Sequence, residues 1–424
     1  MNILIKNAFA ILPEKNQEGC DVYISEGRIA AIGAPPPGFL AEKTIDATDK
    51  LLVPGFINAH THAYMTILRN RADDKNFMTW LFDNIVPIED KLTAEDAYWG
   101  VQLACMEMLR SGVTSFLDMH MFPHSVAKST ADVGIRAVLS RGLQSGEAGA
   151  LRIRQARDDM EEFKNNSLIG FMLAPHAPYT CDEAYLHEIS ELAETLNMGI
   201  NTHLSESRDE QNTIKKRYNM TPAEYYDSCG ILKSNTVCAH CVYLSPDDMD
   251  LLSARGVSVA HNPASNMKLG NGFANLPEMQ KRGINVCLGT DGSASNNNLS
   301  ILREMQLAAL IHKGTTEEAT TVTAHQVFNM ATTNGAKALG LSNQLGEIRL
   351  GMQADLSLFN LREPGFFPIG DPRAALCYSS AGLSAETVLV NGRILLENGE
   401  YTSIDSDRVI YEIRAMCKRL YIDI

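Results

Sequence analysis

The sequence places two histidines one residue apart, as His60-Thr61-His62, at the end of an apolar run. In an extended strand, residues i and i+2 lie on the same face, so both imidazoles can reach a single metal ion. The pair alone is only moderately specific, because histidines at this spacing also occur as ordinary surface or core residues. The position of other ligand-type residues therefore decides between the two readings.

Further metal-binding residue types end other apolar runs of the chain. They are His176, His203, His240, His261 and Asp291. Burying an imidazole or a carboxylate costs about a few kcal/mol unless the group is paired or bound to metal, so their concentration indicates a site that satisfies them. Histidines with one aspartate form a ligand set suited to Zn²⁺, with Fe²⁺ as the alternative.

Glu206 follows His203 by three residues, in the segment HLSES. If the chain turns after His203, this carboxylate can reach back over a metal without binding it and move protons during attack by water. The alternative is a solvated glutamate at the start of a charged helix, because helix starts favour acidic residues.

Eight apolar runs alternate with helix-like segments and predict a parallel (β/α)8 barrel. For one of these helices, Ser245 is the expected cap, Pro246 the first residue and Gly256 the terminator. The functional residues of this fold gather at the carboxyl ends of its strands, where the histidines and Asp291 lie. The runs cover residues 51–62, 112–120, 135–142, 168–178, 198–206, 236–244, 257–265 and 285–293.

The two ends of the chain predict a second, smaller domain. Residues 1–54 contain strand-like runs, and residues 346–424 contain the turn sequences NGR and ENGE between alternating apolar residues, a pattern typical of β-hairpins. We therefore expect an α/β protein with a barrel over residues 55–345. A discontinuous β-sandwich, followed by a C-terminal helix, should form from residues 1–54 and 346–424.

Composition narrows the class of partner. A formal charge of -14 disfavours nucleic-acid backbones and anionic membranes, so a small molecule is the expected partner. No apolar run approaches the roughly 18 residues of a membrane span, and the N-terminus lacks a signal-peptide pattern, which predicts a cytoplasmic protein. The nine cysteines, scattered as single residues, suit buried thiols. Assembly into a homo-oligomer is compatible with the sequence.

The motifs PGFINAHTHAYMT, INTHLSES, VCAHCVYL, VAHNPASNMKLGNG and LGTDGSASNNN together resemble the amidohydrolase superfamily. The similarity runs along nearly the whole chain. Within the superfamily, the pattern is similar to the methylthioadenosine/S-adenosylhomocysteine deaminase branch, which borders on the chlorohydrolases that act on triazines.

The resemblance implies a metal-dependent deaminase. It implies that Glu206 is the proton shuttle, protonating N1 of a purine while water attacks C6, that Asp291 takes the proton of that water, and that His240 lies beside it. No lysine occupies the end of the fourth run, so a carbamylated-lysine bridge between two metals is not expected. The ligands implied for one divalent metal are His60, His62, His203 and Asp291.

The same resemblance implies a nucleoside site. It places Trp80 against the 5′-substituent, Glu89 on the ribose hydroxyls, and Arg141 and His176 on the ribose, base or amino-acid tail. Arg152 is the expected grip on a homocysteine carboxylate, with Arg154 as the alternative. The alternative for Trp80 is packing in the core. The alternative for Glu89, Arg152 or Arg154 is a solvated side chain on a helix surface.

The expected reaction is hydrolytic deamination of 5′-methylthioadenosine or S-adenosylhomocysteine to the inosine analogue and ammonia. The alternatives are another aminohydrolase or chlorohydrolase of the superfamily, acting on guanine, cytosine, 5′-deoxyadenosine or a triazine, and a catalytically inert scaffold of the same fold.

Overall fold

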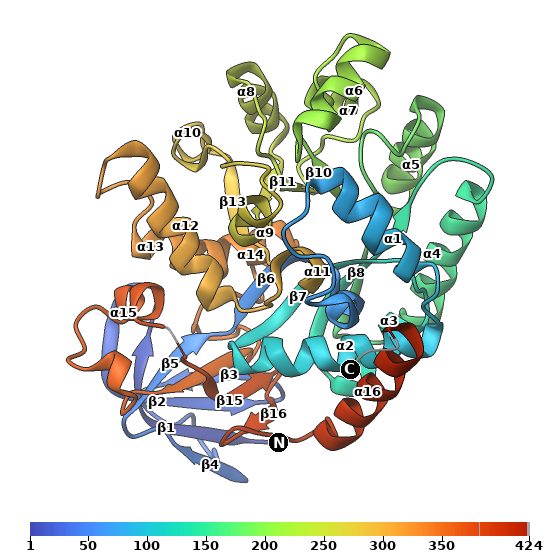
Figure 1. Cartoon of the computed structure of the whole chain (residues 1–424). Helices are drawn as coiled ribbons and strands as arrows, with labels where there is room; N and C mark the ends of the chain where they lie inside the picture. Colours follow the sequence, from blue (N-terminus) through green and yellow to red (C-terminus); the bar gives the residue numbers. More distant parts are fainter. Residues whose placement is uncertain (381, 422–424) are drawn as a thin grey trace.

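A computed structural model describes residues 1–380 and 382–421 and contains a barrel beside a separate sheet (Figure 1). The barrel strands pair in chain order, and all of their pairings are parallel. The ring is completed where the backbone N–H groups of Thr290 and Asp291 donate to the carbonyl of His60, both at 3.0 Å. The predicted fold class is confirmed. The strands are β6 (Phe56–Thr61), β7 (Val113–His120), β8 (Arg136–Leu143), β9 (Ile169–Pro175), β10 (Gly199–Leu204), β11 (Thr236–His240), β12 (Ser258–His261) and β13 (Asn285–Leu288).

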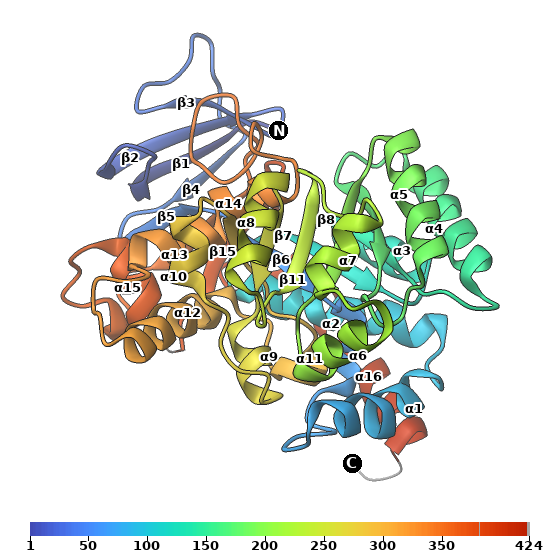
Figure 2. The ribbon, with the colours of Figure 1, turned by 90° about the horizontal axis from the view of Figure 1, so that it is seen from above.

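Helices follow the barrel strands and cover their outer side (Figures 1 and 2). Helix α8 begins and ends where the sequence predicts: the Ser245 side chain accepts from Asp248 N, Pro246 is the first residue, and Gly256 is left-handed at φ 70°. The helices after the strands are η1 (Ala63–Leu68), η2 (Thr79–Ile85), α1 (Val86–Glu89), α2 (Ala94–Arg110), α3 (Ser125–Val133), α4 (Gly149–Phe163), α5 (Glu183–Leu196), α6 (Arg208–Tyr218), α7 (Pro222–Ser228), α8 (Pro246–Arg255), α9 (Pro263–Lys268), α10 (Leu276–Lys281), α11 (Ser293–Asn296), α12 (Ile301–Thr316), α13 (Ala324–Ala331) and α14 (Thr333–Ala338).

The second sheet is built from both ends of the chain, with β4 pairing β1 beside the main strand order β17-β16-β15-β14-β5-β1-β2-β3. Both predicted hairpin turns are present, with Val390 opposite Arg393 and Glu397 opposite Glu400. The remaining elements are β1 (Ile3–Ile11), β2 (Asn16–Ser25), β3 (Arg28–Ile32), β4 (Lys43–Asp46), β5 (Lys50–Pro54), β14 (Leu356–Asn360), η3 (Pro364–Phe366), α15 (Pro372–Tyr378), β15 (Ala385–Val390), β16 (Arg393–Glu397), β17 (Glu400–Tyr401) and α16 (Ser406–Tyr421).

The first apolar run, residues 51–62, holds parts of two strands, and they separate where the sequence places the end of the first terminal segment, between residues 54 and 55. It divides at Gly55 into the end of β5, which belongs to the terminal sheet, and β6, which belongs to the barrel. A Cβ on Gly55 would lie 2.1 Å from the Thr114 side chain, so only glycine fits where the chain passes between the sheets. Both strands are buried along nearly their whole length, and Gly55 marks the point where they separate.

The alternation of β14 shows how the terminal sheet serves two cores. Leu356 and Leu358 join a buried cluster with side chains of β1 and β2, while Phe359 packs into the large cluster that surrounds the barrel. Successive residues of a strand point to opposite faces, so one strand can contribute to both cores. The sheet is thus fixed to the barrel by apolar packing on one of its faces.

A buried ion pair reinforces this junction. Arg136, at the start of β8, donates through Nε and Nη2 to the Asp355 carboxylate at 2.8 and 3.1 Å, and Asp355 also accepts from Asn391 N at 2.7 Å. Both side chains are almost fully buried. Removing one partner of such a pair leaves the other charge buried without compensation.

Within the described residues, no helix combines the length and the apolar character needed to cross a bilayer. All nine cysteines are free and buried, as the sequence indicates.

We expect Asp355→Ala to lower the free energy of unfolding by about 3–5 kcal/mol, because it strands the Arg136 guanidinium in the interior. Urea unfolding followed by circular dichroism measures this change. The matched control is Glu161→Ala, which removes an exposed partner of Lys164 and should cost less than about 1 kcal/mol. Equal losses of stability in the two variants would contradict the stabilising role of the buried Arg136–Asp355 pair.

Candidate active site

The predicted metal-ligating residues meet at the carboxyl ends of the barrel strands. The distance from His62 Nε2 to Asp291 Oδ1 is 3.3 Å, from His62 Nε2 to His203 Nε2 3.3 Å, and from His60 Nε2 to Asp291 Oδ1 3.6 Å. His60, His62 and Asp291 form one group with ligand atoms within 4.8 Å of one another, and His60, His203 and His240 form another. The two groups share His60, so the five side chains form a single cluster.

Hydrogen bonds fix which ring nitrogens face this cluster. His62 Nδ1 donates to the carbonyl of Met119 and His203 Nδ1 to that of His176, each at 2.7 Å. A carbonyl only accepts, so Nδ1 carries the proton and Nε2 is turned toward the cluster, the arrangement common to metal-binding histidines. His60 is fully buried, and neither of its ring nitrogens has a hydrogen-bond partner. This orphaned imidazole fits a metal ion that would satisfy it.

The pKa values of the clustered side chains show which of them carry charge. Burial lowers the pKa of His60 to about 4 and that of His203 well below its usual range. Burial lowers the pKa of His62 as well, but the hydrogen bond and charge of Asp291, with the charge of Asp118 and the Met119 carbonyl, together outweigh burial and raise that pKa to about 9. Against burial, contacts with His60 and His62 hold the pKa of Asp291 well below its usual range. Asp291 is thus ionised beside a protonated His62 and the neutral rings of His60 and His203, and a bound cation would replace the His62 proton at this point.

Glu206 and His240 lie beside the cluster. Glu206 Oε2 is 3.9 Å from His240 Nε2, and its Oε1 accepts from Asn271 Nδ2 at 3.2 Å. His240 Nδ1 is fixed by Asn266 Oδ1 at 2.8 Å. Glu206 is buried, and burial raises its pKa. The solvated-glutamate reading is therefore wrong: the carboxyl is held inside the barrel mouth, where it stays protonated to a higher pH than an exposed glutamate would.

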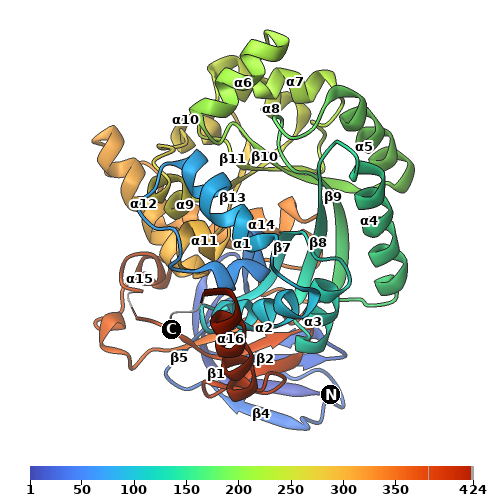
Figure 3. The same cartoon turned by 45° about the vertical axis from the view of Figure 1, so that its right-hand side comes forward.

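A cavity of about 290 Å³ opens above the cluster. In Figure 3 the segment with η2 and α1 lies across this end of the barrel. The predicted residues that line the cavity are Trp80, Glu89, Arg152, His176, His62, His203, Glu206, His240 and Asp291. Trp80 is also buried against Phe77, so core packing and cavity lining are both true of it.

The remaining predicted residues differ in whether they line the cavity. Arg141 is not among the cavity-lining residues; its guanidinium donates to Gln155 Oε1 and to the carbonyl of Gly142. Arg152 lines the cavity and donates to the carbonyl of Gln144 at 2.9 Å, whereas Arg154 is exposed on α4. His261 does not line the cavity and instead packs near His312, with ring centroids 5.5 Å apart.

Sequence reasoning missed Tyr64 and Asn271. Tyr64 is almost fully buried, lines the cavity and donates its hydroxyl to Glu89. Its only sequence signal is its place two residues after His62, in a motif read for its histidines. Asn271 lies in the long turn after α9, and nothing in its neighbourhood marks it as a partner of Glu206.

Two serine hydroxyls orient the Asp291 carboxylate. The hydroxyls of Ser265 and Ser295 both donate to Asp291 Oδ2 at 2.7 Å, which leaves Oδ1 facing the histidines. Cys238 and Cys241 are both buried. The Cys241 thiol lies 3.8 Å from the backbone carbonyl oxygen of Cys238. Burial raises the pKa of Cys241, which disfavours the thiolate that a metal would need.

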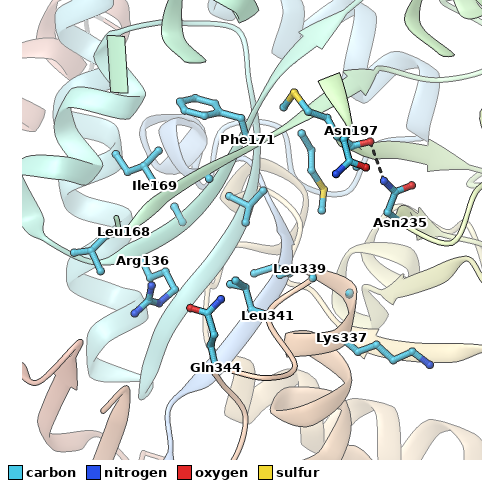
Figure 4. Close-up of a pocket in the computed structure, with 18 of the residues that line it drawn as sticks. Arg136, Leu168, Ile169, Phe171, Asn197, Asn235, Lys337, Leu339, Leu341 and Gln344 are labelled. Carbon is cyan, nitrogen blue, oxygen red and sulfur yellow. Dashed lines mark hydrogen bonds between the residues drawn. The ribbon is translucent and has the colours of Figure 1, made fainter. Parts of the chain in front are cut away.

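A second cavity, of about 520 Å³, lies at the opposite end of the strands (Figure 4). Its wall is formed by the starts of β8, β9 and β10 and by residues 337–344. The Arg136 guanidinium on this wall is already bound to Asp355. The described residues that line this cavity include no histidine, aspartate or glutamate, and we assign the chemistry to the mouth.

The chain was compared with known proteins. The model of the amidohydrolase family matches residues 51–395. Two proteins named 5-methylthioadenosine/S-adenosylhomocysteine deaminase align over nearly their whole length. That of Thermoanaerobacter pseudethanolicus is 41% identical, covering 99% of both chains, and that of Acetivibrio thermocellus is 42% identical, covering 99% of this chain and 100% of the relative.

Solved structures show the same fold. An adenosine deaminase from Xanthomonas campestris with bound zinc superposes with a TM-score of 0.94 at 30% identity, covering 99% of this chain and 98% of that one. A zinc complex of the atrazine chlorohydrolase from Arthrobacter aurescens superposes at 0.90 with 23% identity, covering 98% and 99%, a likeness of fold alone. With a family match across most of its length and full-length relatives above 40% identity, the chain belongs to the amidohydrolase family.

Proposed function

We propose that the protein hydrolytically deaminates an adenosine-type thioether, 5′-methylthioadenosine or S-adenosylhomocysteine, to the inosine analogue and ammonia. The observation that carries this proposal is the buried Glu206–His240 pair beside an ionised Asp291 at the floor of a cavity. Full-length relatives named for this reaction support the choice of substrate.

We assign one divalent metal ion to His60, His62, His203 and Asp291. The orphaned ring of His60 and the Nε2 atoms aimed at the cluster support this ligand set. Three histidines and a carboxylate suit Zn²⁺, with Fe²⁺ as the alternative. Such an ion, when bound, lowers the pKa of a water molecule and so supplies a nucleophile at neutral pH.

The remaining steps belong to protein side chains. Protonated Glu206 would donate to N1 of the purine as the water oxygen adds at C6, so that the negative charge that would otherwise develop on N1 is neutralised. Asp291 would accept the proton of that water at Oδ1, because Oδ2 is occupied by the two serine hydroxyls. His240, held through Nδ1, keeps Nε2 directed at the same space. The proton held by Asp291 would then pass to the amino group, which leaves the tetrahedral carbon as ammonia while the C6 hydroxyl returns a proton to Glu206 and becomes the carbonyl.

Substrate recognition is assigned to the upper cavity. Glu89 would accept the ribose hydroxyls, with one carboxylate oxygen already oriented by Tyr64. Trp80 and Phe77 offer an apolar wall for the thioether, and His176 would contact the base. Arg152 is the candidate for the amino-acid carboxylate of the homocysteine tail.

A substrate panel tests the proposed function. Metal-loaded protein is incubated with methylthioadenosine, S-adenosylhomocysteine, adenosine, 5′-deoxyadenosine, guanine, cytosine and a triazine, and the change in ultraviolet absorbance is followed. Conversion of the adenosine compounds to inosine-type products supports the proposal. Turnover of guanine, cytosine or the triazine with none of the adenosine compounds would overturn the substrate and leave the reaction class intact.

The metal assignment predicts about one tightly bound divalent ion per chain, measured by elemental analysis of purified protein. His60→Ala and Asp291→Ala should lose both the ion and the activity, because each removes a ligand from a single site. Two tightly bound ions per chain would contradict the assignment.

Glu206→Gln should keep the metal and lose at least about a hundredfold in kcat, the typical effect of removing a general acid or base. Metal content and kcat are measured on the same preparation. Near-normal turnover would remove Glu206 from the chemistry, and loss of metal would make it a ligand.

Glu89 predicts a preference for ribonucleosides. A 2′-deoxy substrate leaves the carboxylate partly unpaired, at a cost of about 1–3 kcal/mol, so kcat/KM should fall roughly tenfold or more. Glu89→Ala should erase this difference. A preference that survives in the variant would show that another group reads the ribose.

A further inference from the structure

The backbone between β10 and α6 is held by a carboxylate that takes no part in the chemistry described above. Glu210 lies in the first turn of α6 and is almost fully buried. Its Oε1 accepts from the backbone N–H of Ser205 at 2.7 Å, and its Oε2 accepts from that of Glu206 at 2.9 Å. Both oxygens of one carboxylate therefore hold two successive peptide groups, one of which belongs to Glu206.

This contact departs from ordinary helix capping. Ser207 caps α6 by accepting from Glu210 N at 3.2 Å. In a capping box, the glutamate at this position would return a hydrogen bond to the N–H of the cap residue. Here the carboxylate reaches one and two residues further back, to Glu206 and Ser205. The contact thus acts on the loop rather than on the helix end.

The loop needs such a hold because its backbone is in an unfavourable conformation. Ser205 has φ +52°, in the left-handed region that residues with a Cβ rarely adopt. Along an extended strand, His203 and Glu206 would point to opposite faces. The left-handed Ser205 breaks that alternation, and both side chains then line the same cavity.

Neighbouring contacts hold the other side of Ser205. Its carbonyl accepts from Val242 N at 3.0 Å and from Tyr243 N at 2.9 Å, in the loop that follows β11. Gln211 Nε2 donates to Ser205 Oγ and to the carbonyl of Tyr243. The loop after β10 is therefore fixed to the next loop, while its N–H groups are fixed to α6 by Glu210.

From this geometry we propose that Glu210 is a positioning residue for the reaction. It holds the peptide N–H groups of Ser205 and Glu206 in the left-handed turn that aims the Glu206 carboxyl at the substrate ring. The proposal rests on the proposed role of Glu206 as proton shuttle. A misplacement of about 1 Å in a catalytic group can lower turnover by about a hundredfold, so this hold has a measurable consequence.

The experiment is a double-mutant cycle on the metal-loaded enzyme with Glu210→Gln, Glu206→Gln and the double variant. Glutamine has the shape of glutamate but only one acceptor oxygen, so one of the two N–H groups would meet an NH₂ donor. We expect Glu210→Gln to lower kcat by about tenfold or more, with KM changed less than about threefold and metal content unchanged. In the Glu206→Gln background, the same substitution should cost less than about threefold, because a shuttle that is absent cannot be misplaced.

The matched control is Glu304→Gln. Glu304 is also a fully buried carboxylate near a helix start, and it accepts from the backbone N–H of Ala264 in α9 and from Asn296 Nδ2 in α11. The loss of kcat caused by Glu304→Gln should be the same in the Glu206→Gln background, because Glu304 supports a different part of the site. If Glu210→Gln does not fold by circular dichroism, Glu210→Asp, which keeps the charge but is too short to hold both N–H groups, replaces it in the same cycle.

Equal losses from Glu210→Gln in the wild-type and Glu206→Gln backgrounds would overturn the proposal and make Glu210 a general support of the fold. An effect on KM or metal content alone would overturn it as well. These results are distinct from a failure of the proposed function, which would appear as a wild-type enzyme that is inactive on adenosine compounds. The cycle can then be run on whichever substrate the panel identifies.

Discussion

Asp291 is the charged group around which the barrel mouth is organised. Its backbone N–H donates to the carbonyl of His60 and helps to close the ring of strands between β13 and β6. Its Oδ2 is held by Ser265 and Ser295, while Oδ1 faces His60 and His62. Closure of the barrel, which the N–H of Thr290 shares, and assembly of the site therefore meet at Asp291. A buried carboxylate tolerates this position only with donors on one oxygen and positive charge beside the other.

The loops around Asp291 are fixed by buried polar contacts rather than by regular secondary structure. Ser205, His240, Cys241 and Asp291 all have left-handed backbones at the carboxyl ends of strands. Such conformations persist only where the surroundings over-determine them. Buried carboxylates on the following helices supply part of that support, with Glu210 holding the loop after β10 and Glu304 linking the loops after β12 and β13.

The barrel and the centre of its site could be predicted because both rest on local patterns. Each strand is a short apolar run ending in a polar side chain, and parallel strands bring those ends to one edge. His261 shows the limit of the argument: it ends a strand like the others, but its ring packs near His312 and away from the cavity. Which face a terminal side chain takes depends on the turn after it, and apolar patterning does not encode that turn.

The side chains assigned to the nucleoside were harder to place for a related reason. The family resemblance places Arg141 at the substrate, whereas in the structure its guanidinium donates to Gln155 and to the Gly142 carbonyl. Residue type gives no sign of such local partners. Tyr64 could not be predicted, because a tyrosine near two histidines carries no distinctive sequence signal and only the fold brings it against Glu89.

The residues assigned to catalysis and those assigned to substrate recognition lie on different parts of the fold. The histidines and Asp291 stand at the ends of barrel strands, whose positions are fixed by pairing on both sides. Trp80 and Glu89 lie on η2 and α1, short helices in the long connection between β6 and α2. That connection can change in sequence and shape without disturbing the strands. On the proposed function, the barrel fixes how a ring is attacked, and the segment across its mouth would determine which ring and which tail are admitted.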